Sequence, residues 1–407
     1  MSVRDKDVKT TPRAPSATEE FDLPDMEVDL EKRPSRTQVQ SPSSQSSPTI
    51  TARDWTGPAD PENPWNWSLR KRVYYAASPA GLGFTVSVAS SILTPGIPEI
   101  EHEFRVSRTA ALLALTLYVL GLGFGPTLAA GPSETYGRSM VYKITVLLFM
   151  LFTLGAGLSR TFASLLVTRF LAGFFGGPVL AVGSGTLADV FPPHLRAVSQ
   201  SMFLLAPFFG PALGPVIGGF AAQHKSWRWT QWCTLFIAVT AYIPALFMSE
   251  TYKRIILQRR AARLDLAPPP KLGPPGLLPG LKFLVTVTVF RPLHMLFTEP
   301  LVGVFSLYTA FTFSVLFAFF AAYPYVFEKV YGFSTEQTGL TFLAIGLGVL
   351  LACATSITVD RVVYQKRGGR LRKKGNRWLH QSIGERCCKA RTKAQLTIDG
   401  VTGYTQQ

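Results

Sequence analysis

Residues 200–220 read QSMFLLAPFFGPALGPVIGGF, an apolar stretch with no charged side chain. Glycine and proline recur in it every four residues, at Gly210, Pro211, Gly214, Pro215, Gly218 and Gly219. Four-residue spacing places the glycines on one helical face, where a neighbouring backbone can approach closely. Each proline removes a backbone donor, which a helix tolerates best inside a bilayer. The stretch predicts a membrane helix that bends or slides against a neighbour; a tightly packed structural helix is the alternative.

The composition of the whole chain also indicates a membrane protein. Of 407 residues, 47% are hydrophobic and only 16% are charged, and the mean hydropathy is +0.21. A soluble domain carries about 25% charged residues. Apolar runs long enough to cross a bilayer predict eight spans, at about 73–97, 109–131, 141–158, 162–188, 198–222, 231–248, 300–322 and 338–359. The predicted fold class is therefore an all-α polytopic membrane protein.

The basic residues predict the orientation of the spans. Arg138, Lys143 and Arg196 lie in linkers that follow even-numbered spans, as does a basic run between 253 and 291. The cluster 70–72 precedes the first span. By the positive-inside rule these segments are cytoplasmic, and eight spans place both termini there.

Five segments are predicted. Residues 1–64 are rich in Ser, Pro and acids and should be a disordered cytoplasmic tail. A six-span bundle (65–250), a basic cytoplasmic linker (251–297) and two further spans (298–360) follow. Residues 361–407 carry 12 basic and two acidic side chains, which favours contact with anionic lipid and not with nucleic acid.

No pattern in the chain indicates an enzyme, a metal site or a cofactor. The five histidines are scattered, and the four cysteines have no metal-ligand spacing. Residues 121–125 (GLGFG) have glycines like those of a nucleotide-binding loop, but they lie inside an apolar span and follow no strand.

Part of the chain is repeated. Ser107 precedes span 2, which contains the Gly-Leu-Gly run 121–123, and Ser334 precedes span 8, which contains a second such run at 346–348. Spans 7 and 8 therefore look like a second copy of spans 1 and 2. Two parallel repeats joined by a cytoplasmic loop are the plan of a six-plus-six transporter.

Several motifs together resemble the major facilitator superfamily, and within it the fungal drug:proton antiporters with twelve spans, a group of multidrug and polyamine exporters. They are the loop 131–138 (GPSETYGR), Arg169 with Gly173 and Gly177, the stretch 210–219, and the flanking segments 63–68 (NPWNWS), 227–232 (WRWTQW) and 250–252 (ETY). The resemblance implies a major facilitator fold and export of small organic compounds such as drugs or polyamines in exchange for protons. The plasma membrane is the expected location, with the vacuolar membrane as alternative.

The resemblance also implies roles for single residues. Gly131, Glu134, Gly137 and Arg138 form the loop signature, in which Glu134 and Arg138 would make an ionic contact that holds one state of the transporter. Arg169 would take part in proton coupling; the alternative is that it reaches from the end of span 4 to lipid headgroups.

The remaining residues have supporting roles by the same resemblance. Gly173 and Gly177 would pack span 4. A cytoplasmic charge network would contain Asp189, Arg196, Glu299, Asp360 and Arg361. No acid stands in the middle of a span, so a cationic substrate would meet aromatic faces, for which the candidates are Tyr118, Phe174, Phe175, Tyr308 and Phe311.

The resemblance ends after Arg361, where the family has four further spans. A genuine C-terminal truncation and an error in the gene model both explain this. With only two helices of the second bundle the central cavity lacks a wall, so we expect the 407 residues alone not to carry out coupled transport. The alternative function is therefore a non-transporting fragment or a regulator of a full-length relative. A membrane enzyme is disfavoured because no catalytic constellation is visible.

Overall fold

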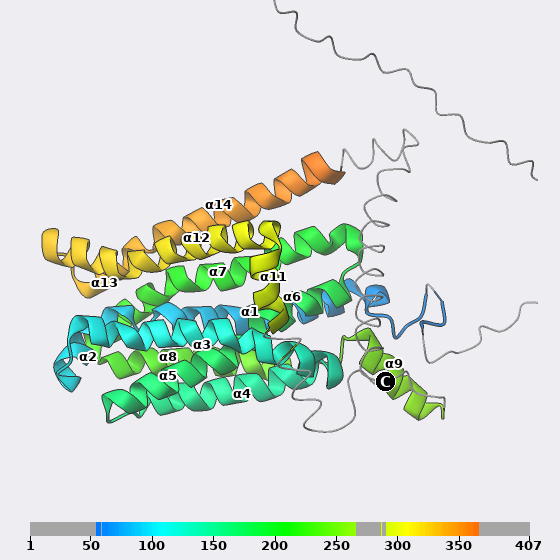
Figure 1. Ribbon diagram of the computed structural model, residues 1–407, viewed down its shortest axis with the longest axis horizontal. Helices are drawn as coiled ribbons and strands as arrows, with labels where there is room; N and C mark the ends of the chain where they lie inside the picture. The colour runs from blue at the N-terminus through cyan, green and yellow to red at the C-terminus, as the bar shows by residue number, and fades with distance from the viewer. Residues whose placement is uncertain (1–53, 58, 266–285, 287–289, 366–407) are drawn as a thin grey trace, which may run out of the picture. The chain divides into compact units, whose positions relative to one another are not determined.

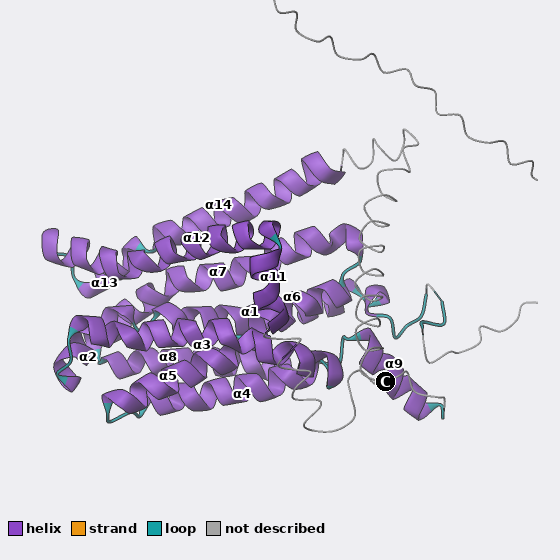
Figure 2. Ribbon diagram, viewed as in Figure 1, coloured by secondary structure: helices purple, strands orange, loops and turns teal. Residues whose placement is uncertain are grey.

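A computed structural model describes residues 54–57, 59–265, 286 and 290–365, which are helical with no strand (Figure 2). The first bundle contains α1 (Leu69–Ser91), α2 (Ile97–Phe104), α3 (Arg108–Thr135), α4 (Arg138–Gly157), α5 (Phe162–Gly176), α6 (Pro178–Val190), α7 (Pro193–His224) and α8 (Trp227–Leu246). The later helices are α9 (Lys253–Arg263), α11 (Arg291–Thr298), α12 (Pro300–Pro324), α13 (Thr335–Thr341) and α14 (Leu343–Val359).

Helices α1 to α8 lie side by side (Figure 1), with α1 against α7, α3 against α5, and α4 against α5 and α8. Their boundaries follow from local sequence. Ser107 and Thr161 accept hydrogen bonds from backbone amides in the first turns of α3 and α5. The fourth predicted span is divided into α5 and α6 at Gly177-Pro178, because proline lacks the amide hydrogen that would continue the hydrogen-bond ladder.

The predicted spans coincide with helices, but their number differs from the prediction. Seven helical segments of the described chain are long and apolar enough to cross a membrane. The sixth predicted span, 231–248, falls on α8, which is a 20-residue helix of the bundle but is not among the seven. Its first turns contain Arg228 and Gln231, which lower its apolar character. An eighth crossing by α8 remains a prediction.

Helices α13 and α14 pack against α7. Gly339 of α13 lies against the carbonyl of Pro215, so that a Cβ there would come 2.5 Å from this oxygen. The hydroxyls of Ser201 in α7 and Ser356 in α14 are 3.1 Å apart. Helix α7 therefore connects the first bundle to the later spans.

The internal repeat has a structural counterpart. Ser107 and Ser334 both cap a helix: the first accepts a hydrogen bond from the amide of Ala110 and the second from the amide of Gln337. A Cβ added at Gly123 or at Gly348 would meet no atom within 4 Å. In both copies a serine therefore caps the start of the helix, and the second glycine of the Gly-Leu-Gly run has no neighbouring atom on its open side.

The N-terminal segment departs from the predicted disorder up to residue 64. Residues 54–57 and 59–68, here called the N-terminal strap, pack on α9. Asp60, with a fully buried side chain, pairs with Arg260 through two hydrogen bonds of 2.8 and 2.9 Å. Glu62 pairs with Arg260 and Arg263, each at 2.7 Å. Acidic residues that suggested a solvated tail thus have cationic partners about 200 positions away in the chain.

Candidate functional site

The glycines of α7 form the contact with α1. A Cβ on Gly210 would lie 2.9 Å from the backbone nitrogen of Val88, and one on Gly214 would lie 3.0 Å from that of Ile92. A Cβ on Gly218 would overlap the carbonyl of Ile92. This glycine face therefore packs inside the first bundle, whereas Gly219 and the carbonyl of Pro215 face α13. Both sequence-based interpretations of this stretch stay open, but the partner of the glycine face is now identified as α1.

Arg169 is buried in the middle of four helices, with 1% of its surface exposed. Its guanidinium donates hydrogen bonds to the carbonyl of Ala89 in α1 (2.9 Å) and to the carbonyl of Ala114 in α3 (3.4 Å). It also reaches Oε1 of Gln231 in α8 at 3.4 Å. The alternative in which Arg169 extends to lipid headgroups is therefore wrong.

An aromatic ring completes the surroundings of Arg169. The guanidinium carbon lies 4.5 Å from the ring centre of Tyr118, whose hydroxyl donates to the carbonyl of Val86 at 2.7 Å. Among the described residues no carboxylate lies within 4.0 Å of the guanidinium. Carbonyl dipoles and a π face therefore replace water around this charge. The ring of Tyr118 therefore contacts the Arg169 guanidinium, and because Tyr118 is fully buried it is not accessible to a substrate in this structure.

Close approach of α5 to α3 brings these groups together. A Cβ on Gly173 would lie 3.1 Å from the nitrogen of Leu122, and one on Gly177 would lie 2.8 Å from Cδ of Pro126. Both glycines therefore lie at the contact between α5 and α3, and the role in packing span 4 that the resemblance implies stays a prediction.

The loop signature is organised by residues other than the predicted pair. Arg138 forms a salt bridge and hydrogen bond with Asp189 at the end of α6. Glu134 is exposed and has no ion-pair partner within the described residues. The predicted Glu134–Arg138 contact is therefore absent from this structure, because Arg138 turns to an acid 51 positions later in the sequence.

Glu250 is the residue of this loop that sequence reasoning missed. Its carboxylate is buried and accepts hydrogen bonds from the amides of Arg138 (3.0 Å) and Ser139 (3.3 Å), at the start of α4. It also accepts from the amides of Thr251 and Tyr252, both at 3.0 Å. Four backbone amides and a helix N-terminus therefore surround this negative charge, an arrangement that stabilises a carboxylate. In the sequence, Glu250 stands out only as part of the segment 250–252 that resembles the family, and nothing in that segment indicates its contact with the start of α4.

Gly137 has a specific reason to be glycine. Its φ is +100°, a conformation that side chains rarely adopt, and a Cβ there would overlap the Glu250 carboxylate. Gly131 lies within the last turns of α3, six residues before this turn. The loop that ends α3 is thus shaped by Gly137 and held by Glu250.

The other members of the predicted charge network lie at different places in the structure, and among them Arg196 is near Asp189. Arg196 donates to the carbonyl of Ala188 at 3.1 Å. Glu299 is exposed at the start of α12, Asp360 is half-buried at the end of α14, and Arg361 is exposed. Of the proposed network, Asp189 forms an ion pair with Arg138 of the loop signature.

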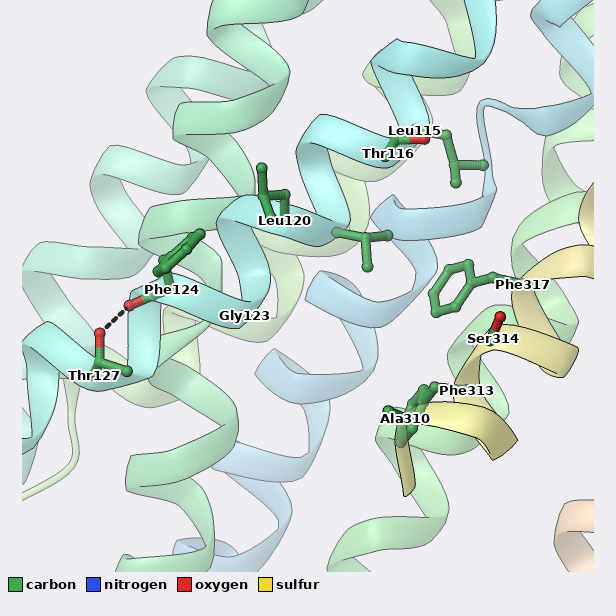
Figure 3. Close-up of a pocket in the computed structure, with 11 residues that line it drawn as sticks. Leu115, Thr116, Leu120, Gly123, Phe124, Thr127, Ala310, Phe313, Ser314 and Phe317 are labelled. Atoms are coloured by element: carbon green, nitrogen blue, oxygen red, sulfur yellow. Dashed lines mark hydrogen bonds between the residues drawn. The ribbon is translucent and has the colours of Figure 1, made fainter. Parts of the chain in front are cut away.

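A cavity of about 640 Å³ lies between α3 and α12 (Figure 3). Its walls are apolar and aromatic with three hydroxyls, and the lining residues are Leu115, Thr116, Val119, Leu120, Gly123, Phe124, Thr127, Ala310, Phe313, Ser314 and Phe317. In Figure 3 the residues of α12 lie opposite those of α3. None of the lining residues is charged, and none is among the five aromatic candidates named from the sequence. A cavity of this size and lining suits a small organic molecule.

Similar proteins have been found in fungi. The chain is 42% identical over 310 residues to "Polyamine transporter 4" of Saccharomyces cerevisiae, covering 76% of this chain and 46% of that protein. It is 33% identical to "Efflux pump radE" of Floropilus chiversii, covering 79% of this chain and 60% of that protein. The chain thus spans about half the length of each relative.

A solved structure has a similar fold. It is that of the proton:xylose symporter XylE bound to 6-bromo-6-deoxy-D-glucose, with a TM-score of 0.52 and 16% sequence identity over 73% of this chain and 70% of that one. The family model "Major Facilitator Superfamily" matches residues 80–376. The match covers the bundle, Arg169 and the later spans, and the chain is therefore a member of the major facilitator superfamily, a family of membrane transporters.

Proposed function

We propose that the protein exports small organic compounds, such as drugs or polyamines, in exchange for protons. The observation that carries the proposal is Arg169, a buried cation that contacts α1, α3 and α8 at once. A buried charge is costly and tends to be retained where it has a role in transport.

The role of Arg169 would be electrostatic. A guanidinium does not release its proton under ordinary conditions, so Arg169 would act as a fixed charge. It donates hydrogen bonds to carbonyls on two different helices, at Ala89 and Ala114. A shift of α5 against α1 or α3 would break them, and a proton or substrate that changes the local charge would alter their strength. This supports a coupling of charge to helix position.

The cavity between α3 and α12 supports the substrate class. Phe124, Phe313 and Phe317 present aromatic rings, and Thr116 and Ser314 add hydroxyl groups. Aromatic faces attract an organic cation, and apolar walls favour its hydrophobic part. The relatives in S. cerevisiae and F. chiversii are named as a polyamine transporter and an efflux pump, which agrees with such substrates.

We further propose that the end of the bundle with Arg138, Asp189 and Glu250 is cytoplasmic, together with both termini. The basic linkers support this orientation. Tags fused to the N-terminus and inserted between 266 and 285 should be protected from an impermeant reagent added outside intact cells. Labelling of either tag would refute the orientation. Imaging of a tagged protein would decide between the plasma membrane and the vacuolar membrane.

Transport is best tested with a chimaera, because the chain covers 46% of its S. cerevisiae relative. The part of that relative that follows its matched region is fused after residue 360, and the purified chimaera is placed in liposomes. With an imposed proton gradient we expect saturable uptake of labelled spermidine or a cationic dye. Arg169→Gln should abolish the gradient dependence, and Arg160→Gln, at an exposed arginine just before α5, should not.

Two outcomes would count against the proposal. The first is a folded chimaera without gradient-dependent uptake while the complete S. cerevisiae relative is active in the same liposomes. The second is an Arg169→Gln chimaera that transports normally. The unfused 407-residue chain is assayed in parallel. If it is inactive and lowers export by the complete relative on co-expression, the alternative of a regulating fragment is favoured.

A further inference from the structure

A second, smaller cavity of about 330 Å³ lies where the N-terminal strap meets the C-terminal end of α6, the first turn of α7 and the start of α9. The strap contributes Trp55, Asn63, Pro64 and Trp65, and the other lining residues are Ala188, Asp189, Arg196, Thr251 and Lys253. It is distinct from the cavity between α3 and α12, with which it shares no residue. Its function is not explained by the proposed transport activity.

Two residues that line this cavity each have a buried polar atom without a hydrogen-bond partner. The hydroxyl of Thr251, on a residue with 1% exposure, makes no hydrogen bond in the described structure. Nε of Arg196 is also buried and without an acceptor. Buried polar groups are nearly always paired, so such orphans indicate a missing partner. Since a guanidinium only donates and a hydroxyl can donate, that partner should supply acceptor oxygens.

Most charges around the cavity are already compensated, and the buried Glu250 carboxylate beside Thr251 accepts four hydrogen bonds from backbone amides. The carboxylate of Asp189 is paired with Arg138, and Lys253 is paired with Asp54 at 2.7 Å. Arg196 lies near Asp189 but has no carboxylate within 4.0 Å among the described residues, and it donates only to the Ala188 carbonyl. The cavity therefore has one cation whose charge no direct ion pair balances. The Asn63 amide adds a further polar group to the lining.

We propose that this cavity binds a phosphate group, held by Arg196, Thr251 and Lys253. Phosphate offers several acceptor oxygens to converging donors, and arginine binds it with particular strength. Either the headgroup of an anionic lipid or a soluble phosphate ester supplies this chemistry. Because Trp55 and Trp65 belong to the strap, a bound phosphate would also stabilise the strap on α9.

Binding is measured on the purified 407-residue chain in two arms. In the first, inorganic phosphate is titrated in detergent while thermal unfolding is recorded. In the second, the chain is placed in nanodiscs of phosphatidylcholine with or without phosphatidic acid, and retained lipid is counted by native mass spectrometry. Phosphatidic acid retained beyond phosphatidylcholine identifies a headgroup as the source. Stabilisation by free phosphate without lipid retention identifies a soluble ester.

Three variants separate the cavity from other basic surfaces. Arg196→Gln should weaken phosphate binding by about 10-fold or more, since a hydrogen bond to a charged group is lost. Thr251→Val keeps the shape of the side chain and should weaken it about 5-fold. Arg259→Gln, at an exposed residue of α9, removes the same charge outside the cavity and should bind like the unmodified chain.

The basic residues after 361 are common to all these proteins, so lipid held by them does not change between variants. The proposal is overturned if neither phosphate nor phosphatidic acid binds. It is equally overturned if Arg196→Gln and Thr251→Val bind phosphate or phosphatidic acid as well as Arg259→Gln does, provided that thermal unfolding shows both variants to be folded. None of these results depends on transport, so they are independent of the test of the proposed function.

Discussion

The contact between α7 and α1 predicts that Gly214→Ala destabilises the first bundle. A Cβ at this position would overlap Oγ of Ser91 and lie 3.0 Å from both the Ile92 nitrogen and the Val88 carbonyl oxygen. The Ser91 side chain is fully buried, and the other two atoms belong to the backbone of α1. None of these three atoms can move away easily, so α7 must move away from α1 or shift along it.

The size of the effect follows from two opposing contributions. Overpacking a dense core typically costs about 1–3 kcal/mol, whereas replacing glycine by alanine in a helix stabilises it by up to about 1 kcal/mol. Gly348→Ala in α14 is the matched control, because a Cβ there meets no atom within 4 Å. The helix gain is common to both variants and cancels, so we expect Gly214→Ala to be less stable than Gly348→Ala by about 1–3 kcal/mol.

The two variants are compared by thermal unfolding in the same detergent. A difference of 1 kcal/mol corresponds to roughly 2–4 °C in a domain of 150–250 residues. Gly214→Leu, with three more carbons, should fail to form a stable bundle. The interpretation of α7 as a helix packed tightly on α1 is refuted if Gly214→Ala is as stable as Gly348→Ala. It is also refuted if Gly214→Leu keeps a normal melting temperature.

Three further predictions concern the loops. Asp60→Asn removes the carboxylate that binds the largely buried Arg260 through two hydrogen bonds, which should cost on the order of 3 kcal/mol and expose the strap to limited proteolysis. Asp54→Asn, at an exposed pair, should not. Arg260 lowers the pKa of Asp60 below its ordinary value. The stabilisation of the strap by this pair is therefore complete above about pH 4 and is lost only as the pH falls further. Limited proteolysis at a series of pH values measures release of the strap, and release at neutral pH would contradict this. Glu250→Gln weakens four amide contacts, two of them at the start of α4, and should destabilise the bundle by about 1–3 kcal/mol in thermal unfolding, whereas Glu134→Gln should have no measurable effect.

Local patterns in the sequence determined the positions of the helices. Apolar runs of about 20 residues predict spans because backbone groups in a bilayer must be satisfied within the helix. The predicted spans coincide with α1, α3 to α8, α12 and α14. The two serines that begin the repeat are helix caps. The motifs also predicted the family to which the chain belongs.

Tertiary structure alone decided the partners of these residues. Arg138 could have paired with Glu134 in the same loop, yet it pairs with Asp189, and the start of α4 is capped by Glu250. Spacing placed the α7 glycines on one face, but the face of α1 against which they lie depends on how the bundle is assembled. Arg169 is buried because four helices converge on it. Helix formation depends on neighbours within a few residues, whereas ion pairs and close helix contacts join segments 50 to 200 positions apart, which local sequence patterns do not specify.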